Sequence, residues 1–200
     1  MLIAIEGIDG AGKTTIARFL KDELEKRGYS VVLLKEPTDG EYGRKIKEAE
    51  KRFEPEEELK LFLLDRKEDV ENNILPALRD GKIVIMDRYY ISSMAYQGAR
   101  GLDMDEIQRA NEEIAPKPDL VIILDVSPQE GLRRVGKRGN RTIFEEESYL
   151  AKVRKNFLKV EHVWSETNRK VVVINAERKL EDVKKDVLDA VLHILSTQSD

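Results

Sequence analysis

The chain has 200 residues and a formal net charge of −4, and 37% of its residues are charged. Acidic and basic residues are interleaved instead of forming blocks, which does not favour a surface that binds a nucleic acid polymer. The sequence has no cysteine and only two histidines, which excludes disulfides and thiol nucleophiles and disfavours a histidine-rich metal site.

No apolar run approaches the ~20 residues that a membrane-spanning helix needs. The N-terminus leads directly into an apolar strand, so we expect no secretory signal. These features predict a cytoplasmic protein with no membrane partner. The length and the 40% apolar content suit a single domain over residues 1–200.

Five short apolar segments predict β-strands. Each is nearly continuous in valine, isoleucine and leucine, as expected for strands buried on both faces of a parallel sheet. The segments are 2–6, 31–35, 83–87, 120–126 and 171–175. Segments with helical periodicity separate them, which predicts a single doubly wound α/β domain with helices on both faces of a five-stranded parallel sheet.

The first predicted strand runs into a glycine-rich stretch that fits the phosphate-binding pattern G-x-x-x-x-G-K-[ST]. Backbone N–H groups of such a loop, and the first turn of a helix predicted over 15–27, form a nest for phosphate oxygens. Lys13 can reach the outer phosphates, and the Thr14 hydroxyl can bind magnesium. The residues predicted to hold ATP and Mg²⁺ are Gly7, Ile8, Asp9, Gly10, Ala11, Gly12, Lys13, Thr14 and Thr15.

A loop over 36–40 follows the second strand, at the sheet edge where sites of open α/β sheets gather. Helices are then predicted over 41–52 and 56–79. In the longer of these two helices, apolar residues recur every three or four positions. The resulting apolar stripe fits either the core or an interface with a second copy, and the sequence does not distinguish the two.

The third strand ends in Asp87 and Arg88. An aspartate in this position beside a phosphate-binding loop can hold magnesium directly or through water, so Asp87 is a predicted metal ligand. Arg88 would lie in the cleft, where its planar fork can contact a phosphate twice. The alternative interpretation makes Asp87 a helix cap and Arg88 a surface charge.

After the fourth strand, Ser127 can cap a helix that has Pro128 at its first position. Five cations then lie within nine residues, around two glycines: Arg133, Arg134, Lys137, Arg138 and Arg141. Such a segment predicts a lid around 133–145 that closes over polyphosphate, although a solvated basic face is the alternative. Helices over 145–164 and 180–195 are predicted to complete the domain.

Three motifs together resemble the thymidylate kinases. Residues 6–14 are similar to the family's opening E-G-x-D/E-G-x-G-K-T, and 62–66 to its F-x-x-x-R. The most specific likeness is to D-R-Y/H followed by S-x-x-A-Y-Q-G, which matches 87–89 and 92–98. The resemblance covers nearly the whole chain, as far as 153–154 and 175–176.

The resemblance implies phosphoryl transfer from ATP to dTMP with Mg²⁺, in a homodimer. Phe62 would then stack on thymine and Arg66 would donate to its O4. Ser93 and Gln97 would make polar contacts to the base. Tyr96 would pack against the sugar at C2′ and leave little room for a ribose hydroxyl.

The resemblance also implies roles near the phosphates. Asp9 would accept from the 3′-hydroxyl, and Arg88 would bridge the acceptor and transferred phosphates. Lys13 and Arg88 are therefore the predicted catalytic residues of the loop and the third strand. Arg133 and Asn175 are assigned to ATP binding.

Some family members carry a further catalytic arginine in the phosphate-binding loop, where this chain has Gly10. The lid is then the expected source of that charge. Arg138 is the first choice because it precedes a hinge-like glycine, and Arg141 is the second. The family's lid motif D-R-x-E is not reproduced here.

A second departure lies after the second strand, where 35–39 read Lys-Glu-Pro-Thr-Asp and not R-E-P-G-G. Arg44 or Lys47 can substitute for the missing loop arginine, and the sequence does not choose between them. Two alternatives to the function also stay open. One is a kinase of another nucleoside monophosphate or of a deoxynucleoside, and the other is a P-loop regulatory protein that binds ATP.

Overall fold

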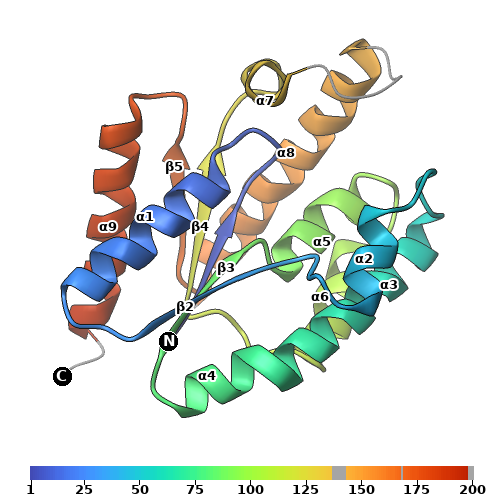
Figure 1. The fold of residues 1–200 in the computed structure, drawn as a ribbon. Coiled ribbons are helices and arrows are strands. Elements are labelled where there is room, and N and C mark those ends of the chain that lie inside the picture. Colours follow the sequence, from blue (N-terminus) through green and yellow to red (C-terminus); the bar gives the residue numbers. More distant parts are fainter. Residues whose placement is uncertain (137–142, 168, 198–200) are drawn as a thin grey trace.

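The computed structural model describes residues 1–136, 143–167 and 169–197. A five-stranded parallel sheet has the strand order β2-β3-β1-β4-β5 (Figure 1). The strands are β1 (Leu2–Glu6), β2 (Val31–Lys35), β3 (Ile83–Asp87), β4 (Leu120–Asp125) and β5 (Val171–Asn175). The predicted sheet is confirmed, and only the fourth strand ends one residue earlier than expected.

Helices fill the connections between the strands. They are α1 (Lys13–Lys26), α2 (Glu41–Lys47), α3 (Pro55–Asp69), the π-helix η1 (Val70–Ile74), α4 (Leu75–Arg79), α5 (Tyr90–Gly98), α6 (Met104–Glu112), α7 (Pro128–Val135), α8 (Ile143–Ser165) and α9 (Leu180–Thr197). Helices α1 and α9 pack together over one face of the sheet, while α3 to α6 and α8 lie on the other (Figure 1). No helix of the described residues is long and apolar enough to cross a membrane.

The three central strands form the core. Every residue of β1 and β3 is buried, and in β4 all but the last are buried. Strands covered on both faces cannot alternate apolar and polar residues, which explains their continuous apolar sequence. Each fully buried leucine or isoleucine contributes about 1.5–3 kcal/mol relative to an exposed one, so this layer dominates the hydrophobic stabilisation.

The helix predicted over 56–79 is continuous but contains the π turn η1. Pro76 follows this turn, has no N–H to donate, and would clash with the carbonyl of Asn72 in a regular α-helix. The wider π turn accommodates the proline. Val70 and Ile74, two members of the predicted apolar stripe, are 3% and 0% exposed and belong to the core.

Helix α2 ends at Lys47, earlier than the predicted residue 52. The reason lies in the side chains beyond it. Arg52 turns toward α3, where its Nε donates to Glu58 Oε1 at 2.9 Å. The Phe53 carbonyl accepts from Arg100 Nη2 at 2.7 Å. These two contacts, the second of them 47 positions apart in the sequence, hold the chain between α2 and α3 in a non-helical path.

Helices α5 and α6 were not predicted from the sequence. Helix α6 begins at Met104 and is capped by Asp103, whose side chain accepts the N–H groups of Asp105 and Glu106, each at 2.9 Å. An aspartate in this place is an ordinary helix N-terminal cap, so the signal was present in the sequence. Helix α5 contains the 92–98 motif and positions its side chains at the site.

All strands are parallel, so their carboxyl ends meet at one edge of the sheet. In spatial order the last residues are Lys35, Asp87, Glu6, Asp125 and Asn175. Strand β1 lies in the middle of the sheet, between β3 and β4. The chain crosses from β1 to β2 toward one edge of the sheet, and from β3 to β4 toward the other edge. Ligand sites of open α/β sheets form at this switch point.

Candidate active site

The phosphate-binding loop connects β1 to α1. Gly7, Gly10 and Gly12 have φ values of 140°, 82° and 93°, a region that residues with a Cβ rarely adopt. At Gly10 a Cβ would also collide with the backbone of Gly131 in α7. Among the described residues, no side chain caps the N-terminus of α1. The N–H groups of its first turn are therefore available to phosphate oxygens.

Lys13 lies against the inside of this loop. Its Nζ donates to the carbonyls of Gly7 at 3.0 Å and Ile8 at 2.8 Å. Burial lowers the pKa of Lys13 to about 7, and the nearby Arg88 charge acts in the same direction. Negative phosphates beside Nζ would raise the pKa again. An anion bound in the loop would therefore favour the charged form of Lys13.

Thr14 and Asp87, the two predicted metal ligands, are in direct contact. The Thr14 hydroxyl donates to Asp87 Oδ2 at 2.5 Å, and Asp87 is 3% exposed at the end of β3. Hydroxyl and carboxylate oxygens are hard ligands of the kind Mg²⁺ prefers. The pair lies directly beside the loop and fits a magnesium ion that also contacts a bound polyphosphate.

A cation from β2 completes the wall of the phosphate cavity. Lys35 lines this cavity of about 210 Å³ together with the loop, and its Nζ is 3.7 Å from Asp87 Oδ2. Lys47, one of the two substitutes considered for the missing loop arginine, instead forms an ion pair with Asp39 at 2.7 Å. Lys35 was overlooked because the sequence does not show that it borders the loop.

Arg88 joins two cavities. It lines the phosphate cavity and also a second cavity of about 130 Å³ between β2, α3 and α5. Its Nη2 donates to Asp9 Oδ1 at 2.5 Å, its Nη1 to Ser92 Oγ at 3.1 Å, and its guanidinium lies 5.2 Å from the centre of the Tyr96 ring. The backbone of Arg88 has a φ of 76°, which costs energy for a non-glycine residue.

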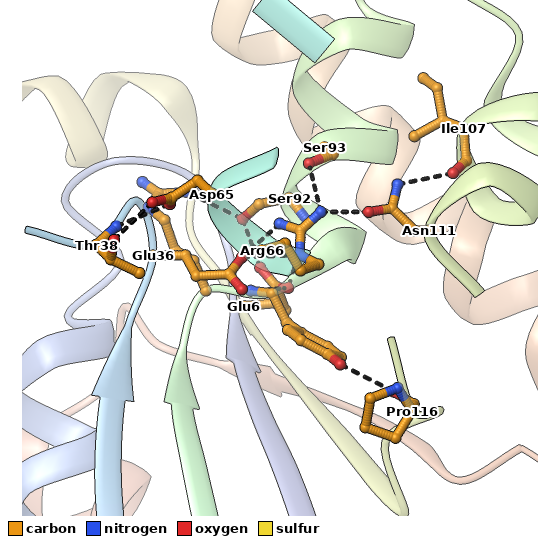
Figure 2. A network of polar contacts seen from close by, with 12 residues as sticks. Glu6, Glu36, Thr38, Asp65, Arg66, Ser92, Ser93, Ile107, Asn111 and Pro116 are labelled. Atoms are coloured by element: carbon orange, nitrogen blue, oxygen red, sulfur yellow. Dashed lines mark hydrogen bonds and ion pairs between the residues drawn. The ribbon is translucent and has the colours of Figure 1, made fainter. Parts of the chain in front are cut away.

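Glu6 positions Arg88, a role that sequence reasoning missed. Glu6 is fully buried at the end of β1 and accepts the N–H groups of Tyr89 and Ser92 at 2.8 and 3.2 Å (Figure 2). Its Oε2 also accepts the Ser92 hydroxyl at 2.6 Å. Because that single proton is directed to Glu6, the Ser92 oxygen can accept from Arg88. Burial raises the pKa of Glu6 to about 7, against the opposing effects of Ser92 and Arg88.

The second cavity brings together residues predicted to contact the base or the sugar of the acceptor. They are Phe62, Arg66, Ser93, Tyr96 and Gln97. Helices α3 and α5 supply them, and the cavity volume of about 130 Å³ suits a single ring. The structure therefore unites residues from two motifs that lie about thirty positions apart in the sequence.

Arg66 is anchored from several sides and is 1% exposed (Figure 2). Its Nε donates to Glu36 Oε2 at 2.9 Å, and its Nη2 also contacts that oxygen. Its Nη1 donates to Ser93 Oγ at 3.3 Å and to Asn111 Oδ1. Asn111 is held in turn by the Ile107 carbonyl, at 2.7 Å from its Nδ2. Arg66 is thus a fixed donor in the cavity wall, set by a buried network that the sequence pattern does not reveal.

A third cavity, of about 380 Å³, lies on the other side of the loop, toward α9. Arg134 lines it and donates through Nη2 to the Ala176 carbonyl at 2.9 Å. The predicted residue here was Arg133, whose side chain is 72% exposed and pairs with Glu130. Neighbouring side chains of a helix point about 100° apart. Because Arg134 faces this cavity, Arg133 points toward solvent.

Asn175, also assigned to nucleotide binding, is exposed, and its side chain caps the following turn. Its Oδ1 accepts the N–H of Glu177 at 2.9 Å. Its neighbour Ala176 lines the third cavity. The other two predicted catalytic residues, Arg138 and Arg141, lie outside the described residues, so the choice between these lid arginines stays a prediction.

The site has a glycine-rich phosphate loop with a hydroxyl–carboxylate pair beside it. One arginine connects this loop to a cavity for a single ring. These features together define a P-loop kinase of small metabolites. The comparison with known proteins is more specific. The chain belongs to the thymidylate kinase family, whose model matches residues 5–187.

Similar proteins come from archaea and bacteria. A probable thymidylate kinase of Archaeoglobus fulgidus is 54% identical over 187 residues, which cover 94% of this chain and 92% of that protein. A probable thymidylate kinase of Pyrococcus horikoshii is 44% identical over 202 residues, with 96% of each chain covered. A thymidylate kinase of Akkermansia muciniphila is 48% identical over 165 residues, covering 82% of this chain and 80% of the relative.

Proposed function

We propose that this protein transfers the γ-phosphoryl group of ATP to dTMP and produces ADP and dTDP, a step of dTTP synthesis. The observation that carries the proposal is the position of Arg88, whose side chain lines both the phosphate cavity and the ring-sized cavity. Family membership supports the identity of both substrates. Phosphoryl transfer requires in-line placement and cations around the transferred group, which this arrangement can supply.

On the donor side, the loop N–H groups and Lys13 would hold the β- and γ-phosphates. Thr14 and Asp87 would hold Mg²⁺, which neutralises charge on the phosphate oxygens when it is bound. Arg134 and Ala176 border the cavity that is placed for the nucleoside of ATP. Lys35 adds a positive charge to the wall of the phosphate cavity.

On the acceptor side, thymine would enter the ring-sized cavity, with Phe62 against its face and Arg66 donating to O4. Tyr96 would lie against the deoxyribose. Asp9 would accept from the 3′-hydroxyl with the carboxylate that Arg88 also contacts. Arg88 would then reach the 5′-phosphate of dTMP and the phosphoryl group in transit.

Coupled assays that follow ADP formation test the function. The purified protein is supplied with ATP and, in turn, with dTMP, dUMP, CMP, AMP and thymidine. We expect dTMP to be the preferred acceptor. Preference for another monophosphate or for thymidine would favour another kinase of this fold, and ATP consumption that no acceptor alters would favour a regulatory ATP-binding protein.

We further propose that the protein works in the cytoplasm as a homodimer. The apolar stripe of the helix over 56–79 divides into two parts. Val70 and Ile74 are buried in the core, whereas Leu63 is only half-buried and can pack against a second copy. Light scattering coupled to size-exclusion chromatography would measure the mass in solution.

Replacing Arg66 with alanine should weaken dTMP binding and also destabilise the fold. Loss of a charge-assisted bond to a base carbonyl should raise the KM for dTMP by about 10- to 150-fold, that is by roughly 1.5–3 kcal/mol. The KM for ATP should barely change. The variant should also unfold more easily, by about 3–5 kcal/mol, because Glu36 loses its buried partner.

The variant Arg66→Met with Glu36→Gln separates these two effects. It removes the unpaired charge, so it should recover most of the stability without recovering dTMP affinity. Thermal unfolding and steady-state kinetics provide the two measurements. Equal increases in KM for ATP and dTMP would contradict a direct role of Arg66 at the base.

Replacing Tyr96 with alanine should relax discrimination against ribonucleotides. The ring is held between Arg88 and Phe157, and its hydroxyl accepts the N–H of Asp9 at 3.1 Å. Tyr96→Phe keeps the ring and should preserve discrimination. Tyr96→Ala should reduce the kcat/KM preference for dTMP over its ribose counterpart by at least about tenfold. An unchanged preference in Tyr96→Ala would place the sugar elsewhere.

A further inference from the structure

Glu58 of α3 accepts hydrogen bonds from three side chains, which come from two other parts of the chain beside the ring-sized cavity. It is 7% exposed. Its Oε1 accepts from Arg52 Nε at 2.9 Å. Its Oε2 accepts from Arg100 Nη1 and from Gln97 Nε2, each at 2.9 Å. One carboxylate thus fixes the loop before α3 and the end of α5 relative to each other.

The charge state of Glu58 decides which atom of Gln97 can face it. Burial acts against ionisation, but hydrogen bonds from Arg52 and Gln97 outweigh it and lower the pKa of Glu58. The group is therefore a carboxylate, which only accepts hydrogen bonds. Only the amide nitrogen of Gln97 can face Glu58, so the amide oxygen must point away from it.

The Gln97 oxygen has no partner within the described part of the chain. Gln97 is 1% exposed and lines the ring-sized cavity, and its Oε1 is a buried acceptor without a hydrogen bond among the described residues. Such an atom is unfavourable in the folded state unless a ligand or water donates to it. The donor Arg66 lines the same cavity. Gln97 and Arg66 thus border the same space, where a planar ring can contact an acceptor and a donor.

This pattern complements an imide, in which an N–H lies next to a carbonyl. Thymine and uracil carry a donor at N3 and an acceptor at O4. Cytosine has the reverse arrangement, with an acceptor at N3 and a donor amino group at C4. If Gln97 turned its amide nitrogen to the cavity, it would donate to N3 of cytosine and would no longer favour the N3–H of thymine or uracil.

We propose that Glu58 is a specificity-determining residue that excludes cytosine nucleotides by fixing the orientation of the Gln97 amide. The proposal rests on the function proposed above and deepens it. Glu58 itself also lines the ring-sized cavity. It acts through Gln97, whose oxygen accepts the N3–H of the acceptor base.

The test uses the variant Glu58→Gln and compares dTMP, dUMP and dCMP. The introduced amide has the same shape as the carboxylate but can present an oxygen or a nitrogen, so the Gln97 amide becomes free to turn. The kcat/KM ratio of dTMP to dCMP should fall by at least about tenfold, as expected for one mismatched hydrogen bond. The ratio of dTMP to dUMP should stay within about twofold, because both bases carry the same N3–H and O4.

Arg100→Gln is the matched control. Arg100 also donates to Glu58 Oε2 but does not line the cavity, and its loss leaves the contact between Glu58 and Gln97 in place. This variant should be less stable and yet keep the dTMP to dCMP ratio. Gln97→Met provides a second route to the same result if Glu58→Gln fails to fold, because it removes the acceptor itself.

Dissociation constants from titration calorimetry supply the ratio where dCMP turnover is too slow to measure. If wild type prefers dTMP and neither Glu58→Gln nor Gln97→Met changes the dTMP to dCMP ratio, the specificity inference is overturned while the proposed function stands. If the three nucleotides lose activity equally, Glu58 only supports the fold. A wild-type protein that prefers dCMP to dTMP would overturn both the inference and the proposed function.

Discussion

Lys13→Ala should reduce kcat by at least about a thousandfold, which corresponds to roughly 4 kcal/mol of lost transition-state stabilisation. The side chain is held inside the phosphate loop by two carbonyls, at 3.0 and 2.8 Å from Nζ. A phosphate bound in this loop would lie beside Nζ, whose charge would then stabilise the oxygens that gain charge during transfer. Steady-state kinetics with ATP and dTMP measure the loss.

Lys21→Ala is a suitable control for the Lys13 variant. Lys21 lies on the same helix but pairs with Glu25 at the surface, at 2.6 Å, and its removal should leave the rate unchanged. Near-normal turnover of a folded Lys13→Ala variant would contradict the assignment of the phosphate loop.

Lys13 should also affect the pH dependence of stability. Its pKa in the folded protein is about 7, below the value of about 10 for an ordinary lysine. The folded state therefore binds this proton less tightly than the unfolded chain, and stability should increase as pH rises from about 7 toward about 10. Denaturant unfolding at several pH values should show a smaller increase for Lys13→Ala than for wild type.

The sheet was predictable because its signal is local. Strands buried on both faces must be continuously apolar, and four of the five predicted strands have the bounds that the structure shows. Interruptions were harder to predict. The π turn before Pro76 depends on how a helix accommodates a proline. The early end of α2 depends on the contact of Arg52 with Glu58 and on that of Phe53 with Arg100, 47 positions away.

The motif residues of the site were predictable because their chemistry requires particular residue types at fixed spacing. Lys13, Thr14, Asp87 and Arg88 lie together as expected. The residues that hold them were not predictable. Glu6 accepts a hydrogen bond from Ser92, which lies 86 positions away in the sequence, and no local pattern predicts such a contact.

Asn111 and Glu58 illustrate the same limit at the ring-sized cavity. Their partners, Arg66 and Gln97, lie 45 and 39 positions away in the sequence. In the sequence Glu58 is an ordinary polar position of a predicted helix, and Asn111 lies in a helix that was not predicted. Only the packing of α3 against α5 and α6 brings Asn111 into contact with Arg66 and Glu58 into contact with Gln97.

Replacing Arg88 should have the largest effect on catalysis. Its guanidinium borders both cavities, so it can contact the acceptor phosphate and the group in transit at the same time. Arginines that stabilise such a transition state contribute about 10³–10⁵ in rate, and we expect a loss of that size in Arg88→Ala. Arg88→Lys should recover only part of it, because a point charge cannot contact two phosphates through a planar fork.

Comparing Arg88→Ala with Arg88→Gly separates the catalytic role of the side chain from the strain in its backbone. Both variants lack the guanidinium and should be equally inactive in the coupled assay. The φ of 76° is unfavourable for alanine but not for glycine, so Arg88→Gly should be about 1 kcal/mol more stable than Arg88→Ala. Denaturant unfolding measures this difference. Equal stability of the two variants would mean that the backbone relaxes once the side chain is removed, and that contacts of the guanidinium with Asp9 and Ser92 impose the strained turn that aims Arg88 into the cleft.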